Sequence, residues 1–329
     1  RNPEVGFQEF RTSRKLAEAV EKAGLTVERG LAITGFKARH EFSGDGPTVA
    51  VIAELDSLRV PGHELADPET GAAHACGHHT QSGQILGVIA ALTDPAIASS
   101  LSGAVAFIAA PAEEFIDVEY RWELHSAGKL GLMAGKQEFI RLGELDDVDI
   151  ALLTHVDPSE MHALRPGTSH NGMIAKSVRF VGRSAHAGGG PHLGINALNA
   201  ANLAMQGIAL LRETFQDDDH VRIHPIITRG GSAVSSVPAN VTMEMFIRAA
   251  SIEAIHDAEV KVDRALRAGA MAIGATVDIS TSPGYMPSKL NPELSEVYDE
   301  AVIELLGESG VGRMPHRTSS TDMGDVSLL

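Results

Sequence analysis

Three short apolar runs, each followed at once by carboxylate or imidazole side chains, constrain the fold of this chain more than any other feature. The runs cover residues 47–53, 105–109 and 149–153, and they lead into Glu54-Leu55-Asp56, Pro111-Ala112-Glu113-Glu114 and Thr154-His155. Continuous apolar runs of this length are typical of buried strands. Open α/β sheets place their functional side chains at the carboxyl ends of such strands. We therefore expect an α/β fold in which these side chains meet at one sheet edge.

The segment 71–79, Gly-Ala-Ala-His-Ala-Cys-Gly-His-His, holds the densest set of possible metal ligands. It contains Cys76, the single cysteine of the 329 residues, together with three histidines. A lone cysteine cannot form a disulfide within its own chain, so its thiol either fills a buried space or has a chemical role. Cys76 and His78 can both reach one borderline-soft ion such as Zn²⁺. Taken alone, a buried cysteine in a histidine-rich turn is an equally good interpretation.

The two strand ends downstream favour the metal. One carboxylate of the pair Glu113-Glu114 can bind an ion while its neighbour stays free as a general base. By itself a Glu-Glu pair is better explained as a surface turn. His155 follows a third apolar run, and three strand ends that supply Cys/His, Glu/Glu and His together predict one metal site.

Composition excludes several classes of protein. A hydrophobic fraction of 43% suits a globular core, and 329 residues are enough for two domains. The net charge of −16 argues against nucleic acid or anionic lipid as a partner. No apolar stretch approaches the ~20 residues that span a bilayer. We expect a cytoplasmic protein without a disulfide framework, and we expect the natural protein to extend beyond both ends of this sequence.

The chain changes character near residue 165. Before it, helical periodicity in 9–24, with Phe10, Leu16 and Val20 on the apolar face, and in 82–92 alternates with the apolar runs. This alternation predicts a doubly wound, mostly parallel sheet. After it, expected strands at 174–182, 220–228 and 241–249 and helices at 196–215 and 252–272 predict an α+β insertion. A further helix is expected over 292–306. We therefore predict a discontinuous catalytic domain of residues 1–165 and 281–329, with residues 166–280 inserted as a lid or dimerisation domain.

Six motifs, in order along the whole chain, resemble the metal-dependent aminoacylase/carboxypeptidase superfamily. The resemblance is greatest to the amidohydrolase branch that contains auxin-conjugate hydrolases and aminobenzoyl-glutamate hydrolases. Each motif is weak alone, and their order is what makes the signal specific. The motifs are Asn2-Pro-Glu-Val-Gly-Phe-Gln-Glu9, His74-Ala-Cys-Gly-His78, Pro111-Ala-Glu-Glu114, His155-Val-Asp-Pro158, Gly182-Arg-Ser-Ala-His-Ala187 and Ser320-Thr-Asp-Met-Gly324.

The resemblance implies a role for each matching residue. Cys76, His78, Glu114 and His155 would hold one or two divalent metal ions per subunit, with Zn²⁺ or Mn²⁺ expected first. Glu113 would be the general base and acid. His186 would reach the active site of the partner subunit in a homodimer or higher homo-oligomer and help to hold the oxyanion there. Arg248 and Ser235 would contact the substrate.

Several positions depart from the family pattern or have an ordinary structural explanation. Glu54 stands where carboxypeptidase-like relatives carry a metal-binding His, which leaves its role open. Ser235 occupies a position usually held by Asn. The family's last metal-ligating histidine lies beyond the Asp322-Met323-Gly324 segment and is absent here. This implies either a lost segment or a single ion, and we favour the lost segment.

Arg248 suits a substrate clamp and a structural ion pair equally well, and Asn196 is expected to cap the following helix.

The sequence thus predicts a metal-dependent hydrolase that cleaves the C–N bond of a small carboxylate-bearing substrate, such as an N-acyl or N-aroyl amino acid. The bond is expected to be an amide other than a peptide bond. The alternative is a hydrolytic deaminase of an aromatic amine, such as a nitroanthranilate, on the same scaffold. A non-catalytic binding protein that retains the fold is a third hypothesis, and the presence of Glu113 and every expected ligand other than the last histidine argues against it.

Overall fold

The protein forms two compact units, described here from a computed structural model that covers residues 2–157, 164, 167–312 and 314–329. The first unit comprises Arg1–His162 with Asp325–Ser327 and Leu329, and the second comprises Ala163–Gly324 with Leu328. The expected junction at 165–166 and the motif residue Pro158 lie outside the described residues. Residues 281–324, expected in the catalytic domain, group with the second unit. The domain boundaries stay a prediction.

The first unit is built on a five-stranded sheet in the order β1-β2-β6-β3-β7. The strands β6, β3 and β7 run parallel, as the apolar runs predict, while β2 and β1 extend the sheet in antiparallel pairing on the side of β6. A two-stranded ribbon of β4 and β5 accompanies it. The strands are β1 (Val27–Leu31), β2 (Gly35–Glu41), β3 (Thr48–Glu54), β4 (Leu58–Arg59), β5 (Ala72–Ala73), β6 (Ala104–Ala110) and β7 (Ile150–Leu153).

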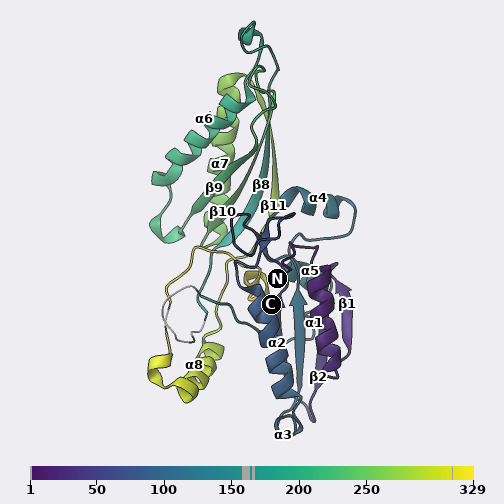
Figure 1. Ribbon diagram of the computed structural model, residues 1–329. Helices are drawn as coiled ribbons and strands as arrows, with labels where there is room; N and C mark the ends of the chain where they lie inside the picture. Colours follow the sequence, from purple (N-terminus) through teal and green to yellow (C-terminus); the bar gives the residue numbers. More distant parts are fainter. Residues whose placement is uncertain (1, 158–163, 165–166, 313) are drawn as a thin grey trace. The chain divides into compact units, whose positions relative to one another are not determined.

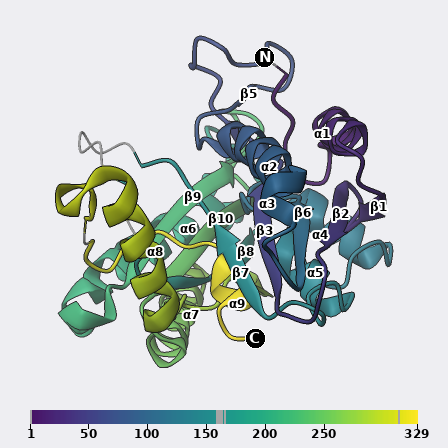
Figure 2. The ribbon, with the colours of Figure 1, turned by 90° about the horizontal axis from the view of Figure 1, so that it is seen from below.

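Helices cover both faces of this sheet, which is the arrangement expected of a doubly wound fold (Figure 2). α1 and α2 pack together on one face, and α5 contacts β6 from the other. The strand β6 is buried at every position because it lies inside the sheet with both faces covered. The helices are α1 (Phe10–Lys22), α2 (His78–Leu92), α3 (Pro95–Ala98), α4 (Val118–Ser126), α5 (Gly135–Arg141) and the terminal α9 (Met323–Val326).

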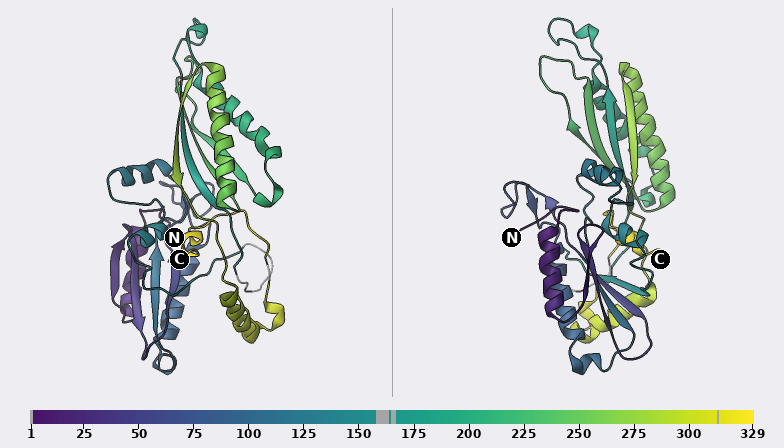
Figure 3. Two further views of the ribbon diagram at one scale, coloured as in Figure 1. Left: turned by 180° about the vertical axis from the view of Figure 1, so that it is seen from behind. Right: turned by 90° about the vertical axis from the view of Figure 1, so that its right-hand side faces the viewer.

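The second unit is a four-stranded antiparallel sheet in the order β11-β8-β10-β9, with α6 and α7 side by side on one face (Figures 1 and 3). The expected α/β fold with a second α+β unit is therefore confirmed. Its elements are β8 (Gly172–Val181), α6 (Ala197–Leu210), β9 (Arg222–Arg229), β10 (Asn240–Ala249), α7 (Ile252–Ile273), β11 (Thr276–Pro283) and α8 (Pro292–Leu306). Short 3₁₀ turns cover Pro191–Leu193, Leu211–Thr214, Asp217–Asp219 and Glu308–Gly310.

Two local expectations are corrected. Phe10, assigned to the apolar face of the first helix, is 60% exposed, and the buried residues of α1 are Leu16, Ala17 and Val20. The helix expected from residue 82 begins at His78, because Gly77 adopts the left-handed conformation and turns the chain directly into α2. His78 therefore lies on a helix rather than in a loop.

Within the described residues, no helix combines the length and apolarity needed to cross a membrane.

Candidate metal centre

Gly77 sets the direction of the two side chains on either side of it. Its φ of 104° is one that L side chains rarely adopt, and a Cβ there would lie 2.2 Å from Cγ2 of Val156. Cys76 thus stays in the loop while His78 becomes the first residue of α2, where it is 1% exposed. This loop lies against the segment after β7, and that contact brings in His155 from the next strand end.

Cys76, His78 and His155 form a cluster whose ligand atoms all lie within 4.8 Å of one another. Sγ of Cys76 lies 3.4 Å from Nε2 of His155. This is close to the separation of about 3.5 Å that a sulfur and a nitrogen ligand have on one tetrahedral ion. The structure therefore brings together three of the four ligands expected from the sequence.

The two histidines present their Nε2 atoms because their Nδ1 atoms are already engaged. Nδ1 of His155 lies 2.7 Å from the carbonyl oxygen of Val156, and Nδ1 of His78 lies 3.0 Å from that of Asp56. A carbonyl oxygen can only accept, so in the neutral imidazole each Nδ1 carries the proton and each Nε2 carries the lone pair. This is the usual way in which a hydrogen bond to the far nitrogen orients a metal-binding histidine.

Glu113 and Glu114 border the cluster at the end of β6. Their nearest carboxylate oxygens lie 3.8 Å and 4.0 Å from Nε2 of His78. The turn that presents them passes through Ala112, whose φ of 55° is unusual for a residue other than glycine. The buried guanidinium of Arg121 supports this turn by donating to the carbonyl oxygens of Ala112, Glu114, Ile116 and Met133. Arg121 was not identified from the sequence, because nothing local links it to this turn.

Two further acidic residues, both in the Glu54-Leu55-Asp56 segment, complete the surroundings of His78. Oδ1 of Asp56 lies 3.2 Å from Nδ1 of His78, and its Oδ2 accepts from the backbone N–H of Glu114 at 2.8 Å. Oε2 of Glu54 lies 3.1 Å from Nε2 of His78. The ammonium of Lys136 donates to Oε1 of Glu54 at 2.6 Å. The sequence pointed to the two carboxylates at the strand end, whereas Lys136 carried no recognisable signal.

The charges around the cluster shift the pKa values of its members. Burial raises the pKa of the Cys76 thiol to about 11, and burial followed by the charge of Asp56 raises that of Glu114. Burial alone would lower the pKa of His78, but Glu54 and Asp56 outweigh it and raise the pKa. Burial would raise the pKa of Glu54, and the charges of Lys136 and His78 instead hold it at about 2. Lys136 and the imidazole of His78 thus lie beside several carboxylates, and the site is strongly acidic.

The buried polar atoms test whether a divalent ion fits these residues. Among the described residues, Nε2 of His78 and Oε1 of Glu114 are buried atoms without a hydrogen-bond partner, although Nε2 lies close to the carboxylate of Glu54. Such atoms are costly unless something compensates them. Thiolate, imidazole and carboxylate ligands suit Zn²⁺ and similar transition ions. The donor set therefore fits a divalent metal.

The residues expected to contact substrate lie in the second unit, in two separate places. The backbone N–H of Ala187, next to His186, donates to the carbonyl oxygen of Ser235 at 2.8 Å, so His186 and Ser235 lie on neighbouring segments. His186 is exposed, and its Nδ1 accepts from the N–H groups of Gly188 and Gly189. Arg248 is the penultimate residue of β10, whose first residue Asn240 follows the Ser235 segment. Arg248 thus lies at the opposite end of this strand.

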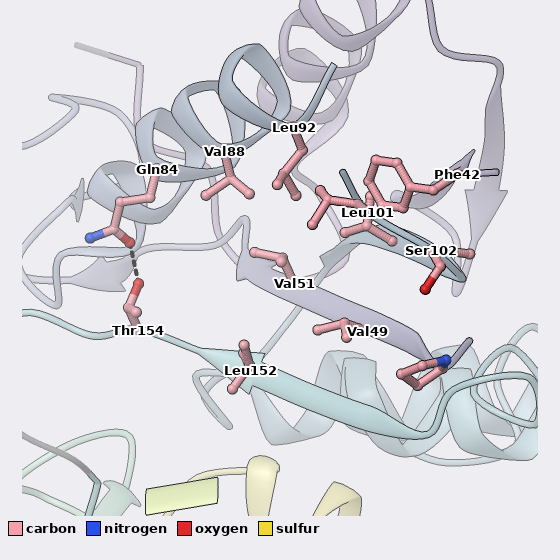
Figure 4. A pocket seen from close by; sticks show the side chains of 13 residues that line it. Phe42, Val49, Val51, Gln84, Val88, Leu92, Leu101, Ser102, Leu152 and Thr154 are labelled. Atoms are coloured by element: carbon pink, nitrogen blue, oxygen red, sulfur yellow. Dashed lines mark hydrogen bonds between the residues drawn. The ribbon is translucent and has the colours of Figure 1, made fainter. Parts of the chain in front are cut away.

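A cavity of about 510 Å³ lies elsewhere in the first unit, between α2 and the face of β3 and β7 (Figure 4). Its walls are mainly apolar, with Val49, Val51, Val88 and Leu152 among them. None of the clustered ligands lines it. It is therefore not the chemical site.

Comparison with known proteins agrees with the sequence motifs. Residues 168–272 match the peptidase dimerisation domain family. The chain is 28% identical over 342 residues to the Xaa-Arg dipeptidase of Mus musculus, across 99% of this chain and 72% of that protein. It is 29% identical over 303 residues to a p-aminobenzoyl-glutamate hydrolase subunit of Escherichia coli, across 88% and 57%. It is 28% identical over 340 residues to IAA-amino acid hydrolase ILR1-like 6 of Arabidopsis thaliana, across 100% and 68%.

Solved structures share the fold. An aminobenzoyl-glutamate utilization protein from Klebsiella pneumoniae superposes with a TM-score of 0.71 at 20% identity, covering 98% of this chain and 83% of that one. A dinuclear metal-binding peptidase of the M20 family from Bacillus subtilis gives a TM-score of 0.67 at 20% identity, covering 99% and 82%. The resemblance inferred from the six motifs is confirmed.

Proposed function

We propose that this chain, a member of the metal-dependent aminoacylase/carboxypeptidase superfamily, hydrolyses the amide bond of a small amino-acid conjugate. The substrates considered first are N-acyl and N-aroyl amino acids. The related proteins carry the names of a dipeptidase, an aminobenzoyl-glutamate hydrolase and an auxin-conjugate hydrolase. All three names describe amide hydrolysis next to an amino acid, so a peptide bond is included among the candidate bonds.

One observation carries this proposal: the ligand atoms of Cys76, His78 and His155 lie within 4.8 Å of one another, with Glu113 next to them. A metal cluster bordered by a carboxylate that can act as a general base is the minimal arrangement for activating water toward an amide. We assign Glu114 as a fourth ligand, since its buried Oε1 lies 4.0 Å from Nε2 of His78. The metal is proposed to be Zn²⁺ or Mn²⁺.

The chain's own residues would divide the remaining work. A divalent ion bound here would polarise the scissile carbonyl and lower the pKa of the attacking water. Glu113 would accept a proton from that water and return it to the leaving nitrogen. His186 would donate a hydrogen bond to the oxygen on which negative charge develops. Arg248 would bind a substrate carboxylate, for which a planar guanidinium is well suited, and Ser235 would add a hydrogen bond.

We further propose a cytoplasmic homodimer or higher homo-oligomer assembled through the second unit. The match of residues 168–272 to the peptidase dimerisation domain supports the assembly. One relative is named as a subunit, so a different partner chain is the competing arrangement. The single cysteine is compatible with a reducing compartment.

The proposal is tested by metal-dependent turnover. Protein is stripped with a chelator, reloaded with Zn²⁺ or Mn²⁺, and offered N-acyl amino acids, dipeptides and aromatic amines, with released amino acid and ammonia measured separately. We expect amino-acid release that is lost on chelation and restored by metal. Glu113→Gln should lower kcat by about 10²-fold or more while metal content is unchanged. Glu123→Gln, an exposed position on α4, is the matched control and should remain active.

The other outcomes are equally informative. Ammonia released from an aromatic amine, without amino-acid release, would replace the amidohydrolase by the deaminase. Tight metal binding without turnover of any compound in the panel would contradict a catalytic role and favour a binding protein. Full activity of Glu113→Gln would remove this residue from the chemistry.

A further inference from the structure

His78 belongs to two groups of ligand atoms at once. Besides the Cys76, His78 and His155 cluster, the described residues place Glu54, His78 and Glu113 with their ligand atoms within 4.8 Å of one another. The Nδ1 of His78 is engaged by Asp56, so the imidazole has a single lone pair left, on Nε2. That lone pair can bind one ion. If it serves the first group, the second group keeps only the carboxylates of Glu54 and Glu113.

The carboxylate of Glu54 already has a cation beside it. Nζ of Lys136 lies 2.6 Å from Oε1, and both side chains are 1% exposed. Gln81, one turn after His78 on α2, holds the other side of the same carboxylate: its Nε2 donates to Oε2 at 2.9 Å, and its Oε1 accepts from the backbone N–H of Glu54 at 2.7 Å. Glu54 is thus fixed at its backbone, at both carboxylate oxygens and by a buried ion pair.

A buried ion pair is not explained by stability alone. Desolvation of two charges costs several kcal/mol per ion, and apolar replacements are often neutral or stabilising. The location of this pair is more informative. The acids Glu54, Asp56, Glu113 and Glu114 surround His78. Lys136 pairs with Glu54, on the carboxylate whose other oxygen lies beside Nε2 of His78. An ion ligated by Glu54 would lie about 2 Å from a carboxylate oxygen, next to this ammonium, and the two cations would repel one another.

We infer that the ammonium of Lys136 occupies the place of a second cation, so that the centre holds one divalent ion per chain. This inference rests on the metal centre proposed above and concerns the number of ions in it. Lys136 is a positioning residue: it neutralises Glu54 and holds it, and thereby leaves Nε2 of His78 to the ion bound by Cys76 and His155. The Bacillus subtilis structure, by contrast, is described as dinuclear.

The test is a count of ions per folded chain. Metal-stripped wild type, Lys136→Met, Lys136→Arg and the double variant Lys136→Met/Glu54→Gln are dialysed to equilibrium against excess Mn²⁺, whose preference for carboxylate oxygens suits the second group. Bound metal is then measured by elemental analysis. In parallel, the shift of Tm with Mn²⁺ concentration is recorded, because an ion that binds only the folded chain raises Tm.

We expect one ion for wild type and for Lys136→Arg, which retains the charge. Lys136→Met has an unbranched neutral side chain of similar length and should bind a second ion, with a larger rise of Tm on adding Mn²⁺ than wild type. The double variant lacks both the ammonium and the carboxylate and should return to one ion. If Lys136→Met folds only in Mn²⁺ while the double variant folds without it, the same conclusion follows.

Two results would overturn the inference and leave the metal centre intact: two ions in wild type, or one ion in a folded Lys136→Met saturated with Mn²⁺. Wild type that binds no Mn²⁺ in this experiment and no Zn²⁺ in the reloading experiment above would instead overturn the proposed metal centre and this inference with it. The two failures are therefore distinguishable from the wild-type count alone.

Discussion

Glu9 is a buried carboxyl group that supports the turn of Glu113 and Glu114 from behind. Its Oε1 accepts from the backbone N–H of Ala112 at 2.8 Å, and its Oε2 accepts from the hydroxyl of Thr34 at 2.6 Å. Burial, followed by the charge of Asp56, raises the pKa of Glu9 to about 8. At neutral pH the folded protein therefore keeps this group protonated, whereas the unfolded chain ionises it.

This difference predicts a pH dependence of stability that a single substitution removes. A group whose pKa is raised on folding stabilises the protein most below its unfolded pKa of 4.5, and that contribution is lost as pH rises toward 8. Glu9→Gln keeps the shape without the titration. We expect the free energy of unfolding of Glu9→Gln, relative to wild type, to increase by about 1.4 kcal/mol per pH unit between these two values.

Denaturant unfolding of both proteins at several pH values measures this difference. Glu18→Gln, at an exposed position of α1, is the control and should follow the wild type throughout. A pH-independent gap between Glu9→Gln and wild type would show that Glu9 has the same pKa in both states.

At the scale of elements, a buried lysine joins α7 to the sheet of the second unit. Lys176 on β8 has a fully buried side chain, and its Nζ lies 2.9 Å from Glu259 and 2.8 Å from Asp263, one turn apart on α7. It also donates to the hydroxyl of Thr281 on the neighbouring strand β11. The lysine thus connects two strands and a helix. Its ammonium is the positive charge that lies between the carboxylates of Glu259 and Asp263.

Lys176→Met should destabilise the second unit by up to about 3–5 kcal/mol, because it leaves two carboxylates, each 27% exposed, without their buried counter-ion. Denaturant unfolding at pH 7 measures the loss. Arg267→Ala is the matched control: Arg267 also pairs with Asp263, but at 3.9 Å and with a side chain that is 64% exposed. An exposed pair of this kind contributes about 0–1 kcal/mol. Equal effects of the two substitutions would contradict a special role for the buried pair.

The start of α6 offers a second test at this scale. The side chain of Asn196 accepts from the backbone N–H groups of Leu198 and Asn199, at 2.9 Å and 3.1 Å, and so caps the helix as expected from the sequence. Asn196→Ala should cost about 1 kcal/mol of unfolding free energy. Asn202→Ala, at an exposed position inside the same helix, should have no destabilising effect. A neutral Asn196→Ala would indicate that tertiary packing alone sets the helix start.

At the scale of the whole molecule, the proposed machinery is divided between two units. The proposed metal ligands and Glu113 belong to the first unit, and His186 belongs to the second. Within the second unit, His186 bridges Ser236 shortly before the start of β10, and Arg248 is the penultimate residue of that strand, so one chain does not gather these two side chains in one place. A symmetric assembly, in which each copy supplies His186 to the other, would account for this arrangement.

Mixing two inactive variants tests this division. Glu113→Gln lacks the base but has an intact His186, and His186→Ala has the reverse. If His186 acts across a dimer, half of the chains in an equal mixture form mixed dimers, each with one complete site. Activity should then recover to about a quarter of the wild-type value after subunit exchange. Each variant alone serves as its own control, and a mixture that stays inactive although mixed dimers form would place His186 in the site of its own subunit.

The clustering of Cys76, His78 and His155 was predictable from the sequence because it rests on local patterns. A continuous apolar run predicts a strand, and parallel strands bring their carboxyl ends to one edge. The strand β6 is buried as expected, whereas β7 is only partly covered because it lies at the edge of the sheet. The positions of Glu113 and His155 follow from the rule for strand ends, whereas the capping by Asn196 follows from the preference of Asn for helix starts. The start of α2 was placed too late because no local pattern shows that Gly77 adopts the left-handed conformation that turns the chain into the helix. The close approach of Val156, which leaves no room for a Cβ at Gly77, is likewise remote in sequence.

Only the tertiary structure revealed the residues that act through burial. Lys136 lies 82 residues from Glu54, and nothing in its own segment distinguishes it from an exposed lysine of an amphipathic helix. Arg121 supports the Glu113–Glu114 turn by contacts with four carbonyl groups that no local pattern indicates. Hydrophobic periodicity records which face of an element is covered, but the charge of a buried side chain acquires its effect from the partners that the folded chain places beside it.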